Sequence, residues 1–162
     1  MAYVIDPGRK ALRKGRFSEP GRAYAITTVT DKRIPWFQVA SFAQLLCRTV
    51  SDPAIVADAR LMCWVVMPDH LHILLHAGEV DLSCVVKRLK GTSARALNRE
   101  IGRAGRFWAP GFHDRAIRKS EDLRNVARYI VANPLRAGLV GYVGNYPYWD
   151  AVWLGARDDA IP

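Results

Sequence analysis

Residues 67–75, MPDHLHILL, place two histidines one residue apart within an otherwise apolar run. The preceding run, 60–66, is also rich in apolar and β-branched residues, which is typical of a strand. Pro68 and Asp69 between the two runs form a turn signal. We therefore expect two strands, at 60–66 and 70–76, joined as a hairpin.

The two histidines share one face of the second strand. Side chains alternate between the faces of a strand, so His70 and His72 point one way while Leu71 and Ile73 point the other way, into a core. Neighbouring imidazoles on one face can converge on a metal ion. A half-buried strand whose solvent face holds two histidines is the alternative, and the pair alone does not decide between them.

The rest of the chain predicts further elements on both sides of this hairpin. A strand is expected at 24–30, helices at 36–50 and 80–99, a short strand at 112–118, and a last helix that begins with Ser120 as its N-cap. That helix must end near Asn133, because Pro134 disfavours helical geometry in the residue before it. The order β-α-β-β-α-β-α predicts an α+β fold, a ferredoxin-like antiparallel sheet with packed helices, followed by loop.

The last predicted helix separates a tyrosine from its apolar face. At 3.6 residues per turn, one stripe gathers Leu123, Val126, Ala127, Ile130 and Val131. Asn125, Tyr129 and Asn133 form a separate row. Tyr129 is therefore not a core aromatic by periodicity, although an amphipathic tyrosine at the helix margin is the alternative to a functional one.

The charge of the chain is strongly positive, with 24 Lys and Arg against 15 Asp and Glu, a formal net charge of +9. Such a charge favours a nucleic-acid partner, although a basic protein without one is the alternative. We interpret 1–20 as a basic N-terminal arm, 21–150 as a single domain and 151–162 as a C-terminal tail. The arm residues that we predict to contact DNA are Arg9, Lys10, Arg13, Lys14 and Arg16.

The cysteines and the apolar runs indicate the compartment. Cys47, Cys63 and Cys84 are too widely spaced for a zinc or disulfide pattern, and we expect buried free thiols in a reducing cytoplasm. The first residues lack the apolar segment of a secretory signal. No apolar run approaches the roughly 18 residues that cross a membrane. We expect a cytoplasmic protein without a membrane partner.

The histidine pair and the tyrosine row combine into one chemistry. A phenol is a possible nucleophile, but its pKa of about 10 leaves it protonated at neutral pH unless a cation or arginines favour the phenolate. A divalent cation could also polarise a phosphoryl oxygen. His70, His72 and the side-chain oxygen of Asn133 would be neutral ligands for it. Imidazole suits Mn²⁺, Co²⁺ or Zn²⁺, whereas Mg²⁺ prefers oxygen, and we predict that the ion is Mg²⁺ or Mn²⁺.

The chain resembles the single-tyrosine HUH transposases, and specifically the REP-associated tyrosine transposases of bacteria. The resemblance is carried by four segments in order: GRFSEPGRAYAITTVT (15–30), WVVMPDHLHILL (64–75), FWAPGFHDRAIR (107–118) and YIVANPLRAGLV (129–140). Each segment alone is modest, whereas four in the right order are highly specific.

The resemblance implies a role for each candidate residue. His70 and His72 would be the metal pair, Asn133 the third ligand and Tyr129 the nucleophile. Such enzymes cut single-stranded DNA beside a hairpin, form a 5′-phosphotyrosine and leave a 3′-OH that can reverse the reaction or join another strand. The resemblance also implies recognition of palindromic repeats, and it favours a monomer although a dimer stays possible.

Two other functions remain open at this stage. One is a module that binds DNA hairpins without cutting them, and the other is a hydrolytic metal nuclease in which water attacks and Tyr129 only positions the phosphate. Trp149 and Trp153 either stack on bases or cover the core. His113 is expected to be structural rather than a DNA contact. A further set is either a DNA surface or the solvated face of the second helix: Lys87, Arg88, Lys90, Arg95 and Arg99.

Overall fold

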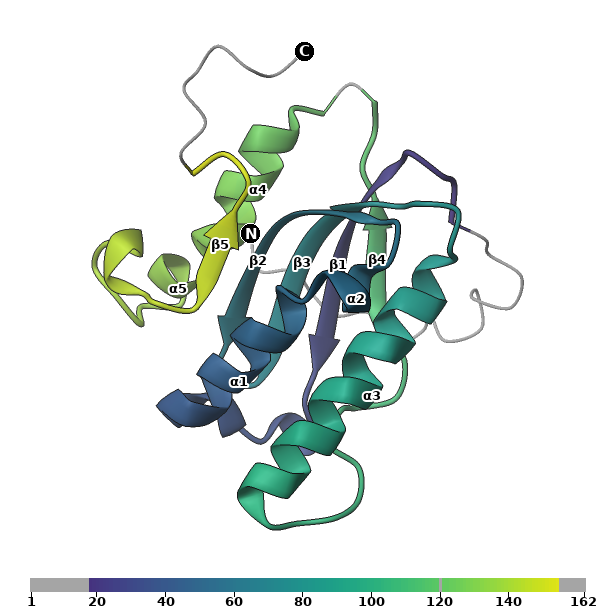
Figure 1. Cartoon of the computed structure of the whole chain (residues 1–162). Helices are drawn as coiled ribbons and strands as arrows, with labels where there is room; N and C mark the ends of the chain where they lie inside the picture. The colour runs from purple at the N-terminus through teal and green to yellow at the C-terminus, as the bar shows by residue number, and fades with distance from the viewer. Residues whose placement is uncertain (1–17, 120, 155–162) are drawn as a thin grey trace.

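The protein is an antiparallel sheet with helices on both faces (Figure 1), seen in a computed structural model that describes residues 18–119 and 121–154. The predicted DNA contacts of the arm lie outside these residues, and the proposed domain boundaries stay a prediction. The strands are β1 (Ala23–Val29), β2 (Arg60–Met67), β3 (His70–His76), β4 (His113–Ala116) and β5 (Trp149–Ala151). The helices are α1 (Ala40–Val50), α2 (Pro53–Val56), α3 (Leu82–Ile101), α4 (Leu123–Val131) and α5 (Asn133–Arg136).

The sheet confirms the predicted fold class. Its strands lie in the order β4-β1-β3-β2-β5, and every neighbouring pair is antiparallel. The succession β1, α1, β2, β3, α3, β4 is the ferredoxin-like order expected from the sequence. The β2–β3 hairpin forms as predicted, so β3 lies at the centre of the sheet.

Three local predictions are wrong. The helix expected at 36–50 is interrupted, because extended backbone at Val39 separates a short 3-10 helix, Trp36–Gln38, from α1. The last helix is capped by Asp122, whose carboxylate accepts a hydrogen bond from the Arg124 N–H at 2.9 Å. Ser120, the predicted cap, lies outside the described residues. The segment expected to be loop contains β5, which pairs with β2.

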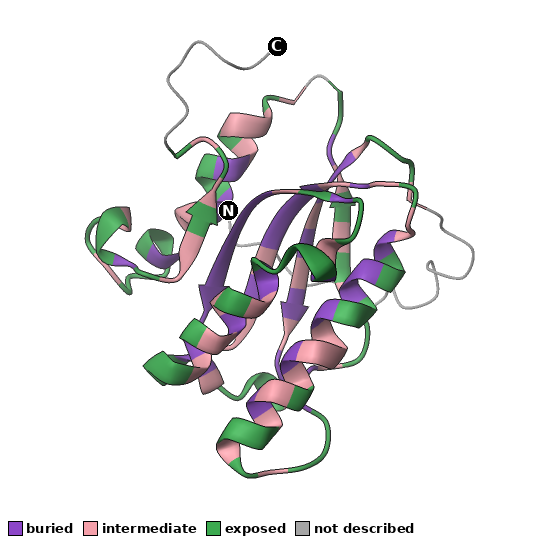
Figure 2. Cartoon of the chain, in the orientation of Figure 1, coloured by how far each residue is buried: buried purple, intermediate pink, exposed green. Residues whose placement is uncertain are grey.

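Two hydrophobic cores lie on opposite faces of the sheet, and Figure 2 shows the central strands buried between the helices. The first core, beneath α1 and α3, includes Ile26, Leu46, Val66, Leu71, Ile73, Val86 and Leu89. The second, beneath α4, includes Val65, Met67, Leu74, Ala127 and Ile130. A fully buried aliphatic side chain of this kind contributes about 1.5–3 kcal/mol. Because Leu71 and Ile73 face the first core, His70 and His72 face the side that carries α4.

The cysteines only partly match the expectation of buried thiols. All three are free; Cys63 is buried, Cys47 is partly buried and Cys84 is exposed on α3. Burial raises the pKa of the Cys63 thiol to about 12. Among the described residues, none of the helices combines the length and the apolar character needed to cross a membrane.

The C-terminal segment is fastened to β2 by an aromatic side chain. The buried Tyr146 hydroxyl donates a hydrogen bond to the Val66 carbonyl at 2.6 Å. The Val66 N–H in turn donates to the Tyr148 carbonyl at 2.8 Å. Trp149 and Trp153 pack against the second core, which supports the interpretation that they cover it.

We predict that Tyr146→Phe destabilises the fold measurably. Losing the buried donor should lower the free energy of unfolding by about 1 kcal/mol. Urea denaturation would measure the change, and Tyr142→Phe is a matched control because Tyr142 is 68% exposed. The control should change the free energy by less than about 0.5 kcal/mol. Equal effects of the two substitutions would contradict an anchoring role for Tyr146.

Candidate functional site

The imidazoles of His70 and His72 lie together on the α4 face of β3. Their ring centroids are 4.8 Å apart and the ring planes are nearly perpendicular, at 89°. Both side chains are half-buried. The predicted shared face is therefore observed, and the two rings lie edge to face against each other.

Each imidazole has its Nδ1 occupied by a protein partner. The Asp69 carboxylate lies 2.5 Å from His70 Nδ1 and also accepts a hydrogen bond from Arg33 at 2.9 Å. Because a carboxylate only accepts, it holds the His70 proton on Nδ1 and leaves the Nε2 lone pair to a metal. Thr27 Oγ1 lies 2.8 Å from His72 Nδ1. When this hydroxyl accepts from Nδ1–H, His72 presents Nε2 in the same way.

The electrostatic environment keeps both rings neutral at pH 7. Burial lowers the pKa of His72 to about 3, and the positive charge of Arg136 acts in the same direction. Burial also lowers the pKa of His70, although the hydrogen bond and charge of Asp69 oppose this. Hydrogen bonds from His70 and Arg33 in turn outweigh burial and hold the pKa of Asp69 below its ordinary value. Neutral imidazoles have the lone pair that metal ligation needs.

Tyr129 and Asn133 lie at the junction of α4 and α5. Tyr129 is 39% exposed, so its ring is accessible from solvent. The Asn133 amide donates from Nδ2 to the Ile130 carbonyl at 2.7 Å. Asn133 Oδ1 accepts from Arg136 Nη2 at 2.7 Å, and the Arg136 guanidinium lies 3.7 Å from the centroid of the Tyr129 ring. The predicted separation of Tyr129 from the apolar stripe of the helix is confirmed, because Ala127 and Ile130 of that stripe are buried.

The structure brings the predicted residues onto one side of the sheet. Helix α4 packs against β2 and β3. Arg136, which holds Asn133 and stacks on Tyr129, is also near enough to His72 to lower the pKa of that imidazole. The imidazole pair and the α4–α5 junction therefore lie on the same face of the sheet, within one chain.

The donor set fits a divalent metal ion. Within 18–119 and 121–154, no group of three His, Cys, Asp or Glu side chains is arranged to hold a metal. A third ligand would therefore come from another side-chain type, and the Asn133 amide oxygen is the group that the sequence singles out. Two neutral imidazoles with an amide oxygen leave the charge of a divalent ion largely uncompensated.

The sequence did not predict three side chains that contact the candidate residues: Asp69, Thr27 and Arg136. A signal existed for Asp69, which directly precedes His70. Thr27 comes from β1 and is brought opposite His72 by strand register. Arg136 lies seven residues after Tyr129 and reaches it only because α4 ends between them.

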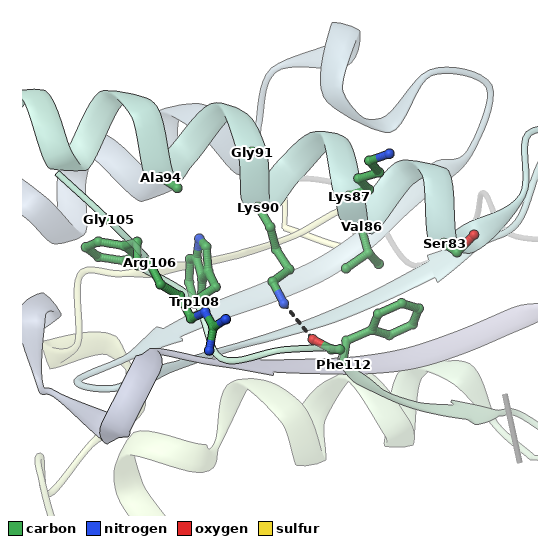
Figure 3. A pocket seen from close by; sticks show the side chains of 12 residues that line it. Ser83, Val86, Lys87, Lys90, Gly91, Ala94, Gly105, Arg106, Trp108 and Phe112 are labelled. Carbon is green, nitrogen blue, oxygen red and sulfur yellow. Dashed lines mark hydrogen bonds between the residues drawn. The ribbon is translucent and has the colours of Figure 1, made fainter. Parts of the chain in front are cut away.

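The basic face of α3 is partly structural. Lys90 Nζ donates to the carbonyls of Ala109 at 2.7 Å and Gly111 at 2.6 Å, which fixes the segment leading to β4. A groove of about 460 Å³ lies along this contact. Figure 3 shows Lys87 and Phe112 in its lining. None of its lining residues belongs to β3, α4 or α5.

His113 and Asp114 lie on the edge strand β4. His113 is exposed at the start of β4, and Asp114 pairs in register with Ile26 of β1. Neither residue lies on β3 or at the α4–α5 junction, and we assign them to the edge of the sheet.

Comparisons with known proteins give a consistent set of relatives. The family model described as "Transposase IS200 like" matches residues 21–133. The REP-associated tyrosine transposase of Escherichia coli K12 is 32% identical over 87 residues, 52% of this chain and 50% of the relative. A protein from Haemophilus influenzae is 32% identical over 94 residues, 51% of this chain and 53% of the relative. The chain spans about half the length of the curated relatives it matches.

A solved structure supports the same fold. The structure of a REP-associated tyrosine transposase bound to a REP hairpin superimposes with a TM-score of 0.66. The match covers 83% of this chain and 79% of the other, at 24% sequence identity. A likeness at this identity shows the shared fold.

Proposed function

Because the chain belongs to the IS200-like transposase family, we propose that it is a metal-dependent endonuclease and strand transferase for single-stranded DNA. The observation that carries the proposal is that the His70–His72 pair and the Tyr129–Asn133 junction lie on the same face of the sheet, where α4 packs against β2 and β3. A nucleophile beside a possible cation site is the arrangement that phosphoryl transfer requires.

Tyr129 performs the covalent step in this proposal. Its hydroxyl loses a proton and attacks the scissile phosphorus, the bond from phosphorus to the 3′ oxygen breaks, and that oxygen takes up a proton to become a 3′-OH. The product is a 5′-phosphotyrosine, which retains the energy of the phosphodiester bond. The 3′-OH of the same strand or of another strand can then attack the phosphotyrosine and release Tyr129.

The imidazole pair and the Asn133 oxygen provide the metal site in this proposal. A divalent ion held there, Mg²⁺ or Mn²⁺, would supply Lewis-acid polarisation of the phosphoryl oxygen and favour the phenolate. Asp69 and Thr27 orient the two imidazoles through Nδ1. Arg136 adds a fixed positive charge against the Tyr129 ring.

The proposed substrate is a single-stranded DNA hairpin formed by a palindromic repeat. The names of the E. coli relative and of the solved complex both refer to REP elements. The net charge of +9 supports an anionic partner. In this proposal the arm residues Arg9, Lys10, Arg13, Lys14 and Arg16 contact the hairpin, and one chain acts as a monomer.

We predict that Tyr129→Phe abolishes a covalent protein–DNA product. Wild-type protein with a single-stranded hairpin and Mn²⁺ should give an adduct on a denaturing gel, and removal of the hydroxyl removes the nucleophile. Hairpin affinity should stay within about twofold, because ring and charge are retained. Tyr142→Phe is the matched control, since Tyr142 lies on the exposed surface.

The alternatives give different results in the same assay. Undiminished cleavage by Tyr129→Phe would identify water as the attacking group and a hydrolytic nuclease. Tight hairpin binding by wild-type protein without cleavage, in either Mn²⁺ or Mg²⁺, would identify a binding module.

We also predict that Asp69→Ala weakens metal binding. Loss of the carboxylate that orients His70 should lower Mn²⁺ affinity about 10- to 100-fold. Calorimetric titration of the protein without DNA measures this directly. Glu79→Ala removes an equal charge from an exposed position and should leave the affinity unchanged. An equal loss in both variants would show a general charge effect and contradict the orienting role.

A further inference from the structure

Arg136 makes three contacts with the two candidate residues of the α4–α5 junction. Its Nη1 donates to the Tyr129 carbonyl at 2.6 Å, and its Nη2 donates to Asn133 Oδ1 at 2.7 Å. The guanidinium carbon also lies 3.7 Å from the centroid of the Tyr129 ring. One side chain therefore contacts the backbone and the ring of the proposed nucleophile and the proposed ligand atom.

The contacts arise because α4 cannot continue through Pro134. A helix leaves its last carbonyls without intrahelical donors, and proline has no N–H to offer the Ile130 carbonyl four residues earlier. The Asn133 side chain takes that position by donating to the Ile130 carbonyl at 2.7 Å. Arg136 does the same for the Tyr129 carbonyl. The end of α4 is thus capped by two side chains that also belong to the site.

The two hydrogen bonds of Asn133 hold its amide in one orientation. Nδ2 donates to the Ile130 carbonyl while Oδ1 accepts from Arg136. Rotating the amide by half a turn would place NH₂ against the guanidinium and an oxygen against a carbonyl, so neither bond could form. An amide oxygen has two lone pairs, and Arg136 uses one of them, which leaves the other for a metal ion.

The same guanidinium restrains the Tyr129 ring. A planar cation stacked on an aromatic face is attracted to it electrostatically. Since the ring is 39% exposed, this contact limits its movement on a side where the core does not. A lysine could not reproduce the arrangement, because a compact ammonium cannot stack as a plane while donating in two fixed directions.

We propose that Arg136 is a positioning residue. It orients the Asn133 oxygen for the metal ion and holds the Tyr129 ring in the orientation from which its hydroxyl attacks. The proposal rests on the proposed function. Arg136 need not touch DNA in this role, so its substitution should affect metal binding and the rate of adduct formation while leaving hairpin affinity intact.

The test compares Arg136→Lys with Arg128→Lys. Arg128 is a suitable control because it is exposed on α4 and donates to Asn125 one turn earlier, at 3.1 Å. Three quantities are measured for each protein: Mn²⁺ affinity without DNA, hairpin dissociation constant, and single-turnover adduct rate at saturating hairpin and Mn²⁺. Melting temperature without metal is recorded as a measure of folding. Arg136→Gln, which keeps a donor but loses the charge, gives a second variant if the lysine variant does not fold.

The positioning role predicts a specific pattern. Arg136→Lys should lower Mn²⁺ affinity about tenfold, as for other groups that orient a ligand. The single-turnover rate should fall about 100-fold, because small misplacements of a reacting group are this costly. Hairpin affinity should stay within about twofold, and Arg128→Lys should match wild type in all three measurements.

Other outcomes overturn the proposal. Unchanged metal affinity and rate would leave Arg136 without a positioning role, and a loss confined to hairpin affinity would make it a phosphate contact. A fall in melting temperature, with rate and metal affinity restored on cooling, would make it purely structural. If wild-type protein forms no adduct, the proposed function fails on its own, while the Mn²⁺ titration without DNA still decides whether Arg136 orients the ligand.

Discussion

The double pairing of β3 is the constraint on which the site depends. β3 pairs with β1 along one edge and with β2 along the other, and both registers are antiparallel. A slip of one residue would exchange the two faces of the strand, moving His70 and His72 into the first core and Leu71 out of it. Because Leu71 and Leu75 are almost completely buried, such a slip is strongly disfavoured. The hydrophobic effect therefore determines which face carries the imidazoles.

The second half of the site depends on a helix that ends early. Pro134 interrupts the helical backbone, and the side chains of Asn133 and Arg136 fold back to satisfy the carbonyls left at the end of α4. The same hydrogen bonds orient the amide and place a guanidinium on the Tyr129 ring. A requirement of backbone chemistry thus produces a fixed polar cluster on the face of the sheet that also carries the imidazoles.

The sequence was informative where a local pattern reflects a repeating geometry. Alternation over β3 correctly predicted the shared face of His70 and His72, and helical periodicity separated Tyr129 from Ala127 and Ile130. The hairpin and the order of elements were enough to predict a ferredoxin-like sheet.

Features that depend on distant contacts could not be predicted in this way. β5 has only three residues and exists through pairing with β2 and the anchoring of Tyr146 to Val66, which no local pattern indicates. The partnership of Thr27 with His72 requires the register of two strands far apart in the chain. The roles of Arg9 and the other arm residues stay predictions.

The central claim is that one chain supplies both the imidazole pair and the phenol. The most direct measurement mixes two inactive variants, His72→Ala and Tyr129→Phe, in equal amounts with a hairpin that wild-type protein converts to a covalent adduct. The account predicts that the mixture stays at the background level of each variant alone, because neither chain holds a complete site. Adduct formation in the mixture would contradict it, since the imidazoles of one chain would then be acting on the tyrosine of another.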